Sequence, residues 1–367
     1  MKFQPAAFLS AFFTLSLCAF SILVSCKTAP VPITDVPDDI PPEDEPVEEA
    51  VGVEEEEFAG FDFIADDLAS LPKSEFAEVW GYVVARNEKS LKPGYPVSDV
   101  VYFGAEVDQY GTIVNIPNRK TLPRSNARVH VSIVCGSGGL THFLLEPESR
   151  ARSNFLKALI AMARDYDGLN IDMELVPLQD AANFLSLLQE LKNTLDGKIL
   201  SVCVPARDSE SRTYNYNNIA KIADKVFVMA YDEHWSGSSP GPVASMKWCK
   251  NVAAYALKTI GAKKLVMGIP FYGRSWANTS TARALIASTT DTLIKNQNVE
   301  RIDRESGVPK FTYSVDVKVT VYFEDAYSIA ARMDMYRNMG VNKIGFWRIG
   351  QEDTAVWNYI KISPTTE

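Results

Sequence analysis

The sequence predicts an α/β protein built as a (β/α)8 barrel, with a small insertion between its seventh and eighth strands. Short β-rich runs alternate with amphipathic helical patterns over about 290 residues, which indicates a parallel sheet with helices outside it. Polar and aromatic residues also gather where several of these runs end. In a barrel of eight such units, the carboxyl ends of the strands form the face that carries an active site.

The first 25 residues read as a leader that is cleaved from the chain. Lys2 is the only charge before an apolar run over 6–23, and the segment 23–26 (Leu-Val-Ser-Cys) resembles a bacterial lipobox. A plain signal peptide and an N-terminal anchor helix are the alternatives, because the apolar run is long enough to span a bilayer. We expect Cys26 to be lipidated, which would make this an extracytoplasmic, membrane-anchored protein, either periplasmic or at the cell surface.

Residues 26–57 are predicted to form an acidic, proline-rich disordered stalk. From residue 27 onward this segment holds six prolines, twelve acidic residues and a single base, Lys27, so it cannot bury enough apolar surface to fold. At about 3 Å per residue its reach is on the order of 90 Å. The whole chain carries −9, the leader +1 and the stalk −11, which leaves about +1 for residues 58–367. A domain without charge bias gives no indication of nucleic-acid binding.

Residues 58–77 are expected to link the stalk to a domain over residues 78–362. The expected strands lie at 78–85, 99–107, 128–136, 168–175, 198–205, 225–232, 264–271 and 343–349. An open doubly wound sheet is the competing architecture, but no glycine-rich phosphate loop follows the first strand. The longest gap between strands separates the seventh from the eighth, which places the insertion there, and a helix over 325–339 leads into the last strand.

The fourth strand combines burial with acidic side chains. Side chains alternate between faces in a strand, so Asn170, Asp172 and Glu174 share one face. The other face carries Leu169, Ile171, Met173 and Leu175. An exposed antiparallel strand would also alternate, but amphipathic helical patterns flank this run on both sides and favour a buried parallel strand. Burying an amide and two carboxyls is costly unless they bond one another or a ligand, so we interpret the row as catalytic.

Cysteine and histidine usage argues against a metal site or a disulfide framework. Beyond the leader and the proposed lipidation site, the chain has Cys135, Cys203 and Cys249, an odd number without a Cys-x-x-Cys pair. The first two lie in apolar strand-like runs, where a small buried thiol is the ordinary interpretation. The chain has three histidines and none of them forms a His-x-x-x-His pair, which argues against a metal site. We therefore expect neither a metal nor another cofactor.

Four segments carry recognisable motifs, in order, within residues 78–360. They are 167–174 on the fourth strand, 229–232 (Met-Ala-Tyr-Asp) on the sixth, 268–276 on the seventh and 346–350 on the eighth. Together they resemble glycoside hydrolase family 18, the chitinase-type barrels. The resemblance implies a (β/α)8 barrel that hydrolyses N-acetylglucosamine polymers.

A subgroup is also indicated. Segments 234–237, 241–244 and 347–353 resemble bacterial family members that act on peptidoglycan, including spore-cortex N-acetylglucosaminidases. Asn170 departs from the family signature, which has an aspartate there; we expect the amide to hydrogen-bond Asp172 without adding a charge. Glu174 is present, which argues against the family's inactive sugar-binding members. The short insertion argues against the deep, walled groove of chitinases that thread long polymers.

The resemblance also implies roles. Glu174 would be the general acid, and the substrate's own 2-acetamido oxygen would be the nucleophile. Asp172 would hold the acetamido N–H, Tyr231 would hydrogen-bond its carbonyl, and Asn170 completes the catalytic set. The expected substrate contacts are Trp347 as the floor under the sugar, with Asp232 and Tyr272 beside it. Asp167 is expected to support its turn and Arg274 to brace a loop carboxylate.

The leading functional hypothesis is a tethered hydrolase that cuts β-1,4-linked N-acetylglucosamine bonds in peptidoglycan. A chitinase, or an endo-β-N-acetylglucosaminidase releasing host N-glycans, is the second enzyme hypothesis. A carbohydrate-binding lipoprotein without turnover is the hypothesis from another class, and the set of Asp172, Glu174 and Tyr231 disfavours it. The expected partners are therefore a polysaccharide containing N-acetylglucosamine and, through the lipid anchor, a membrane.

Overall fold

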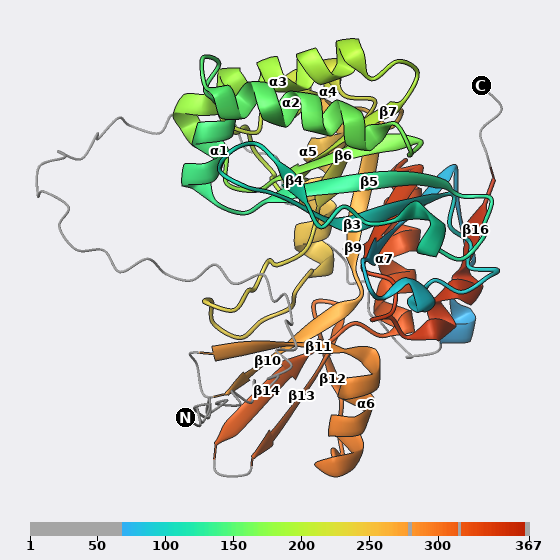
Figure 1. Cartoon of the computed structure of the whole chain (residues 1–367). Helices are drawn as coiled ribbons and strands as arrows, with labels where there is room; N and C mark the ends of the chain where they lie inside the picture. The colour runs from blue at the N-terminus through green and yellow to red at the C-terminus, as the bar shows by residue number, and fades with distance from the viewer. Residues whose placement is uncertain (1–67, 278–280, 315–316, 364–367) are drawn as a thin grey trace, which may run out of the picture. The chain divides into compact units, whose positions relative to one another are not determined.

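The computed structural model describes residues 68–277, 281–314 and 317–363, so the leader, the stalk and Cys26 lie outside the described residues. Eight parallel strands close into a barrel (Figure 1). In chain order they are β2 (Glu78–Val84), β3 (Asp99–Val107), β5 (Arg128–Cys135), β6 (Gly168–Met173), β7 (Ile199–Pro205), β8 (Lys225–Met229), β9 (Leu265–Pro270) and β15 (Lys343–Trp347). The pairing of β15 with β2 and of β2 with β3 closes the ring, which confirms the predicted barrel and each of its eight strands.

Helices follow most of the strands and pack their buried residues against the barrel sheet. They are α1 (Gly138–Leu145), α2 (Arg150–Ala163), α3 (Ala181–Thr194), α4 (Tyr216–Ile222), α5 (Met246–Thr259) and α7 (Ala326–Asn338). In Figure 1, α1 to α4 form a layer beside β5, β6 and β7. Side-chain oxygens of Ser149, Ser245 and Asp325 accept hydrogen bonds from the first turns of α2, α5 and α7, which fixes where these helices begin.

The insertion between β9 and β15 is a folded unit with its own small core. A five-stranded antiparallel sheet comprises β10 (Tyr272–Ala277), β11 (Thr281–Ile286), β12 (Asp303–Glu305), β13 (Val308–Ser314) and β14 (Lys318–Tyr322), and α6 (Ala287–Asn296) joins β11 to β12. Leu285, Phe311, Val321 and Phe323 form one buried cluster of this unit. The insertion lies where the sequence places it and consists mostly of regular structure.

Short elements complete the domain. They are β1 (Ser74–Phe76), β4 (Ile113–Val114), β16 (Ile360–Ile362) and the 3-10 turns η1 (Leu68–Ser70), η2 (Glu88–Ser90), η3 (Arg119–Thr121), η4 (Leu178–Asp180) and η5 (Thr354–Tyr359). Within the expected linker over 58–77, β1 pairs in parallel with β16, and Phe76 is buried in the main core. The last part of that segment therefore packs with the barrel domain.

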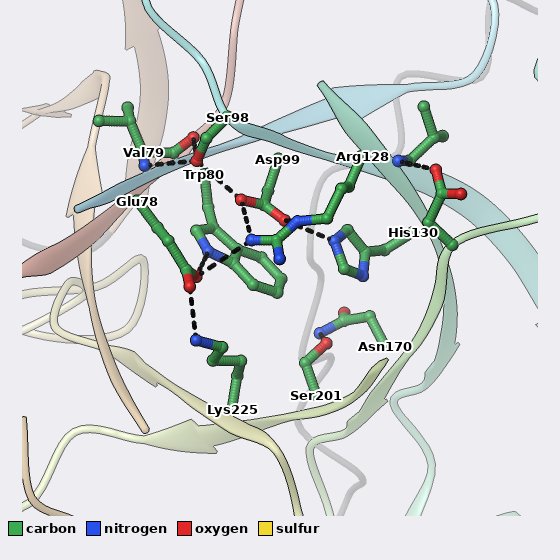
Figure 2. A network of polar contacts seen from close by, with 12 residues as sticks. Glu78, Val79, Trp80, Ser98, Asp99, Arg128, His130, Asn170, Ser201 and Lys225 are labelled. Atoms are coloured by element: carbon green, nitrogen blue, oxygen red, sulfur yellow. Dashed lines mark hydrogen bonds and ion pairs between the residues drawn. The ribbon is translucent and has the colours of Figure 1, made fainter. Parts of the chain in front are cut away.

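A polar network occupies the amino-terminal end of the barrel (Figure 2). Asp99 is fully buried and accepts hydrogen bonds from His130 at 2.8 Å and from Arg128 at 2.7 and 2.9 Å. Glu78 binds Lys225 and the Trp80 indole. Burial favours the neutral acid, yet the bonds from His130 and Arg128 lower the pKa of Asp99 overall. These partners compensate the carboxylates of Asp99 and Glu78, so we interpret the network as structural.

None of the helices in the described ranges combines the length and the apolar character that a membrane span requires.

Candidate active site

The acidic row lies inside the barrel, on a strand that is buried along its whole length. Every residue of β6 is buried, and β6 lies between β5 and β7. Leu169, Ile171 and Met173 pack in the main core, so Asn170 and Asp172 occupy the opposite, inward face. Two details differ from the sequence prediction. Glu174 lies one residue beyond the strand, and Leu175 is 44% exposed because the chain has left the sheet there.

Asn170 is the centre of a hydrogen-bond network in the barrel interior. Its Oδ1 accepts hydrogen bonds from Ser132 Oγ at 2.9 Å and the Tyr82 hydroxyl at 3.2 Å, with the Cys203 thiol at 3.5 Å. Its Nδ2 donates to Ser201 Oγ at 2.9 Å. The expected hydrogen bond to Asp172 is wrong, because side chains of three other strands, β2, β5 and β7, supply the amide's partners instead. Asn170 therefore holds the inward face of β6 in place, deeper in the barrel than Asp172.

Asp172 is a buried carboxyl with unused hydrogen-bonding capacity. It is 4% exposed, and among the described residues its Oδ1 has no hydrogen-bond partner. Burial raises the pKa of Asp172 strongly, and the neighbouring charge of Glu174 raises it further. A buried acceptor without a partner is uncommon in folded proteins and indicates a group held ready for a ligand.

Glu174 is held at the mouth of the barrel by its own backbone. Its N–H donates to Cys135 O at 3.1 Å, and the Tyr214 hydroxyl donates to Met173 O at 2.6 Å and accepts from Val176 N at 3.0 Å. The turn is thereby fixed on both sides of Glu174. Burial raises the pKa of Glu174, and the charge of Asp232 adds to the rise, so this carboxyl retains its proton to higher pH than an exposed glutamate.

Tyr231 and Asp232 follow β8 and face the start of the insertion. Asp232 Oδ1 accepts hydrogen bonds from the Tyr272 hydroxyl and from Arg274 Nη2, each at 2.6 Å. Arg274 braces a loop carboxylate as expected. The Tyr231 ring lies 6.3 Å from that of Tyr272, and the pKa of Tyr231 is raised by burial and by Cys203, Asp172 and Tyr272. Tyr231 also packs against the buried cluster of the barrel interior that contains Tyr82 and Cys203.

Trp347 lies at the end of β15, within an aromatic cluster of the barrel interior. Its ring centroid is 5.3 Å from that of Tyr82 and 5.0 Å from that of Phe103. The indole is half-buried, so part of it stays available to a ligand. Asp167, by contrast, accepts from Val129 N at 2.7 Å and pairs with Arg119, a structural arrangement in keeping with the support of its turn.

The structure brings together the sequence-predicted residues from four strand ends and adds several that were missed. Tyr82, Ser132, Ser201 and Cys203 form the layer beneath Asn170, and Tyr214 fixes the turn of Glu174. Inward-facing polar positions on the first, third and fifth strands were the available signal for the layer. For Tyr214, which lies in a loop, the sequence offers no signal.

Other concave sites lie away from these carboxyls. A cavity of about 880 Å³ adjoins Glu78, Ser98 and Arg128 at the amino-terminal end of the barrel, and one of about 440 Å³ lies on the insertion beside Phe311 and Tyr313. Neither includes Asp172 or Glu174 in its lining. Among the residues described, no group of three or more histidine, cysteine or acidic side chains is arranged to hold a metal ion.

The geometry can be compared with known proteins. The family model described as glycosyl hydrolases family 18 matches residues 78–352, three quarters of the chain. The chain belongs to this family. It is 32% identical to an uncharacterized glycosylase, YvbX, of Bacillus subtilis over 229 residues, which cover 58% of this chain and 66% of the relative. It is 26% identical to a cortical fragment-lytic enzyme of Bacillus cereus over 290 residues, covering 71% and 66% of the two chains.

A solved structure agrees with the family assignment. The chitinase of Chromobacterium violaceum superimposes with a TM-score of 0.67 at 26% identity and covers 77% of this chain and 97% of its own. The chain thus spans 66% of the length of each of these two curated relatives and 97% of that chitinase chain.

Proposed function

We propose that this protein is a glycoside hydrolase that cleaves β-1,4-linked N-acetylglucosamine polymers, with peptidoglycan as its substrate. The observation that carries the proposal is the pair Asp172 and Glu174. Asp172 Oδ1 is a buried acceptor without a hydrogen-bond partner among the described residues, and Glu174 is a partly accessible carboxyl whose pKa is raised. An acid whose pKa is raised above that of an exposed glutamate, beside an acceptor for a substrate N–H, supplies what substrate-assisted glycoside hydrolysis requires.

In the proposed mechanism Glu174 gives its proton to the glycosidic oxygen as the bond from C1 to that oxygen breaks. The carbonyl oxygen of the substrate's 2-acetamido group attacks C1 from the opposite face and forms an oxazolinium-like intermediate. Glu174, now ionised, takes a proton from water as the water oxygen attacks C1. The bond between C1 and the acetamido oxygen breaks in this step, which regenerates the 2-acetamido group. Two inversions at C1 retain the configuration of the sugar, and the net reaction consumes one water.

The side chains around Glu174 would bind and orient the substrate. Asp172 Oδ1 would accept the acetamido N–H and stabilise the positive charge of the intermediate. Tyr231 would donate to the acetamido carbonyl, and Trp347 would carry the apolar face of the sugar ring. Asn170 acts through its network, which fixes the strand beneath Asp172. Only a polymer with a 2-acetamido group on the reacting unit can then be cleaved, and hydrolysis of a plain glucan would contradict this mechanism.

Peptidoglycan is favoured over other polymers by two observations. The cortical fragment-lytic relative aligns over most of the barrel. In this chain, the sequence that precedes the barrel resembles a lipoprotein leader followed by a long acidic stalk. A tether of this kind would hold the enzyme outside the cytoplasm, within reach of a wall polymer. The similarity to a chitinase structure supports chitin as the second candidate.

The test compares the wild type with Glu174→Gln on purified peptidoglycan and on chitin oligomers, with new reducing ends counted and products identified by mass. Glu148→Gln, at an exposed glutamate, is the matched control. We expect N-acetylglucosamine reducing ends from peptidoglycan, a loss of at least about 1,000-fold in Glu174→Gln, and no loss in the control. Cleavage of chitin alone would favour the second candidate, and equal activity of Glu174→Gln and wild type would refute the assignment of the acid.

A further inference from the structure

Arg348 differs from the other arginines that are at least partly buried. Six of these, within the ranges that the structure describes, pair with a carboxylate. The pairs are Arg119 with Asp167, Arg128 with Asp99, Arg152 with Glu190, Arg274 with Asp232, Arg304 with Asp325, and Arg332 with Glu324. Arg348 is half-buried, and its guanidinium has neither an ion pair nor a hydrogen bond to any described residue. It is therefore a half-buried cation without a partner in the described part of the chain.

The position of Arg348 is fixed at the mouth of the barrel. It follows Trp347 directly at the carboxyl end of β15. Trp347 O accepts a hydrogen bond from Phe271 N at 2.8 Å, and Ile349 N donates to Tyr82 O at 3.0 Å. The backbone on both sides of Arg348 is thus anchored to the ends of β9 and β2. Arg348 is therefore next in sequence to the proposed sugar floor, on an anchored backbone, at the end of the barrel where the acidic row also lies.

Keeping such a cation half-buried has a cost. Burial lowers the pKa of the Arg348 side chain, whereas Asp232 raises the pKa of the similarly placed Arg274 overall despite its burial. A guanidinium nevertheless remains charged at neutral pH. A partly buried charge without a partner is unfavourable for the fold, so its presence beside the proposed binding surface indicates that the partner arrives with the ligand.

We propose that Arg348 binds a carboxylate of the glycan and so selects peptidoglycan over neutral N-acetylglucosamine polymers. This inference rests on the proposed function, because it assigns a specificity determinant to the same cleft. A guanidinium offers paired N–H donors that match a carboxylate in a bidentate arrangement. Chitin has no carboxylate. In peptidoglycan the carboxylate has two sources, the lactyl group on O3 of muramic acid and the peptide stem attached to it.

The experiment measures kcat/KM for the wild type, Arg348→Gln and Arg348→Lys on three substrates. These are intact glycan strands with peptide stems, strands whose stems have been removed by an amidase to free the lactyl carboxylate, and chitin oligomers. Arg337→Gln, at an exposed arginine near the end of α7, is the matched control. Thermal unfolding of each variant reports whether the fold is retained.

We expect Arg348→Gln to lower kcat/KM by about 10- to 100-fold on at least one carboxylate-bearing substrate and far less on chitin oligomers. The kcat/KM of Arg348→Lys on that substrate should lie between those of the wild type and Arg348→Gln, because lysine keeps the charge and loses the bidentate geometry. A larger loss on trimmed strands than on intact ones assigns the lactyl carboxylate, and the reverse assigns the stem. Esterifying that carboxylate should remove the difference between the wild type and Arg348→Gln.

Equal losses of kcat/KM on all three substrates, or no loss on any, would overturn the role of Arg348.

A binding measurement separates this inference from the proposed function. If the wild type cleaves none of the substrates but binds trimmed strands more tightly than chitin oligomers, and Arg348→Gln removes that preference, hydrolysis fails while carboxylate recognition stands. If cleavage of peptidoglycan is present and the preference is not affected by Arg348, the hydrolase stands and the inference fails.

Discussion

Arg274 and Asp232 form an ion pair of 2.6 Å that joins the first strand of the insertion to the loop after β8. The Tyr272 hydroxyl donates to the same carboxylate oxygen. Asp232 in turn contributes to the raised pKa of Glu174. One carboxylate therefore connects the insertion to the proposed acid, and the insertion takes part in shaping the site through this contact.

Arg274→Gln should lower both stability and activity. The side chain of Asp232 is 39% exposed, so solvent screening limits the coupling to on the order of 1 kcal/mol. A double-mutant cycle with Asp232→Asn, measured by denaturant unfolding, gives this coupling directly. Additive effects of the two substitutions would show that the pair contributes nothing beyond its separate residues.

Asp172→Asn should abolish activity and should make the protein more stable than the wild type, by an amount that grows as the pH rises. Because its pKa is raised in the fold, Asp172 keeps its proton at a pH where the unfolded chain has released it, above about 3.9. In that window the folded state binds more protons, so the free energy of unfolding falls with increasing pH. Asparagine does not titrate and avoids the loss. We expect the melting temperature of the variant to exceed that of the wild type by more at pH 7.5 than at pH 4.5; a difference independent of pH would contradict the raised pKa.

Asn170→Leu should be strongly destabilising. It leaves the hydroxyls of Tyr82, Ser132 and Ser201 without the amide that bonds them, at a cost of roughly 2–4 kcal/mol. Asn170→Asp should cost less, because a protonated carboxyl keeps the acceptor oxygen and can donate to Ser201. Unfolding in urea measures both, with Asn218→Leu at an exposed position on α4 as control. Similar losses for Asn170→Leu and Asn170→Asp would show that the network is not the cause.

Gly268→Ala should displace Tyr231. A β-carbon at this position would lie 2.7 Å from Val228 O, 2.9 Å from the Phe227 ring and 3.0 Å from the Tyr231 ring. We expect a stability loss of about 1–3 kcal/mol and a fall in kcat of at least about 10-fold, since the tyrosine hydroxyl moves. Gly139→Ala, where no atom lies within 4 Å, is the control. Unchanged kcat in Gly268→Ala would argue against a role for the exact placement of Tyr231.

Much of the barrel and the acidic row could be predicted because each depends on short-range patterns. Alternation with period two identified the strands and assigned Asn170, Asp172 and Glu174 to one face, and the helical patterns on either side indicated a parallel sheet. The expected bond from Asn170 to Asp172 was wrong for the same reason. Neighbours along one strand are obvious in a sequence, whereas the true partners of Asn170 come from β2, β5 and β7.

The sequence by itself determined the order of the elements, the inward face of β6 and the set of residues able to do the chemistry, because side-chain direction in a strand follows from position along the chain. Only the tertiary structure decided which groups have partners. Arg274 has Asp232 and Asn170 has a complete network, while Asp172 Oδ1 and the Arg348 guanidinium have none among the described residues. Pairing is a property of groups brought together from distant parts of the chain by barrel closure, and it is this closure that leaves two polar groups available to a ligand.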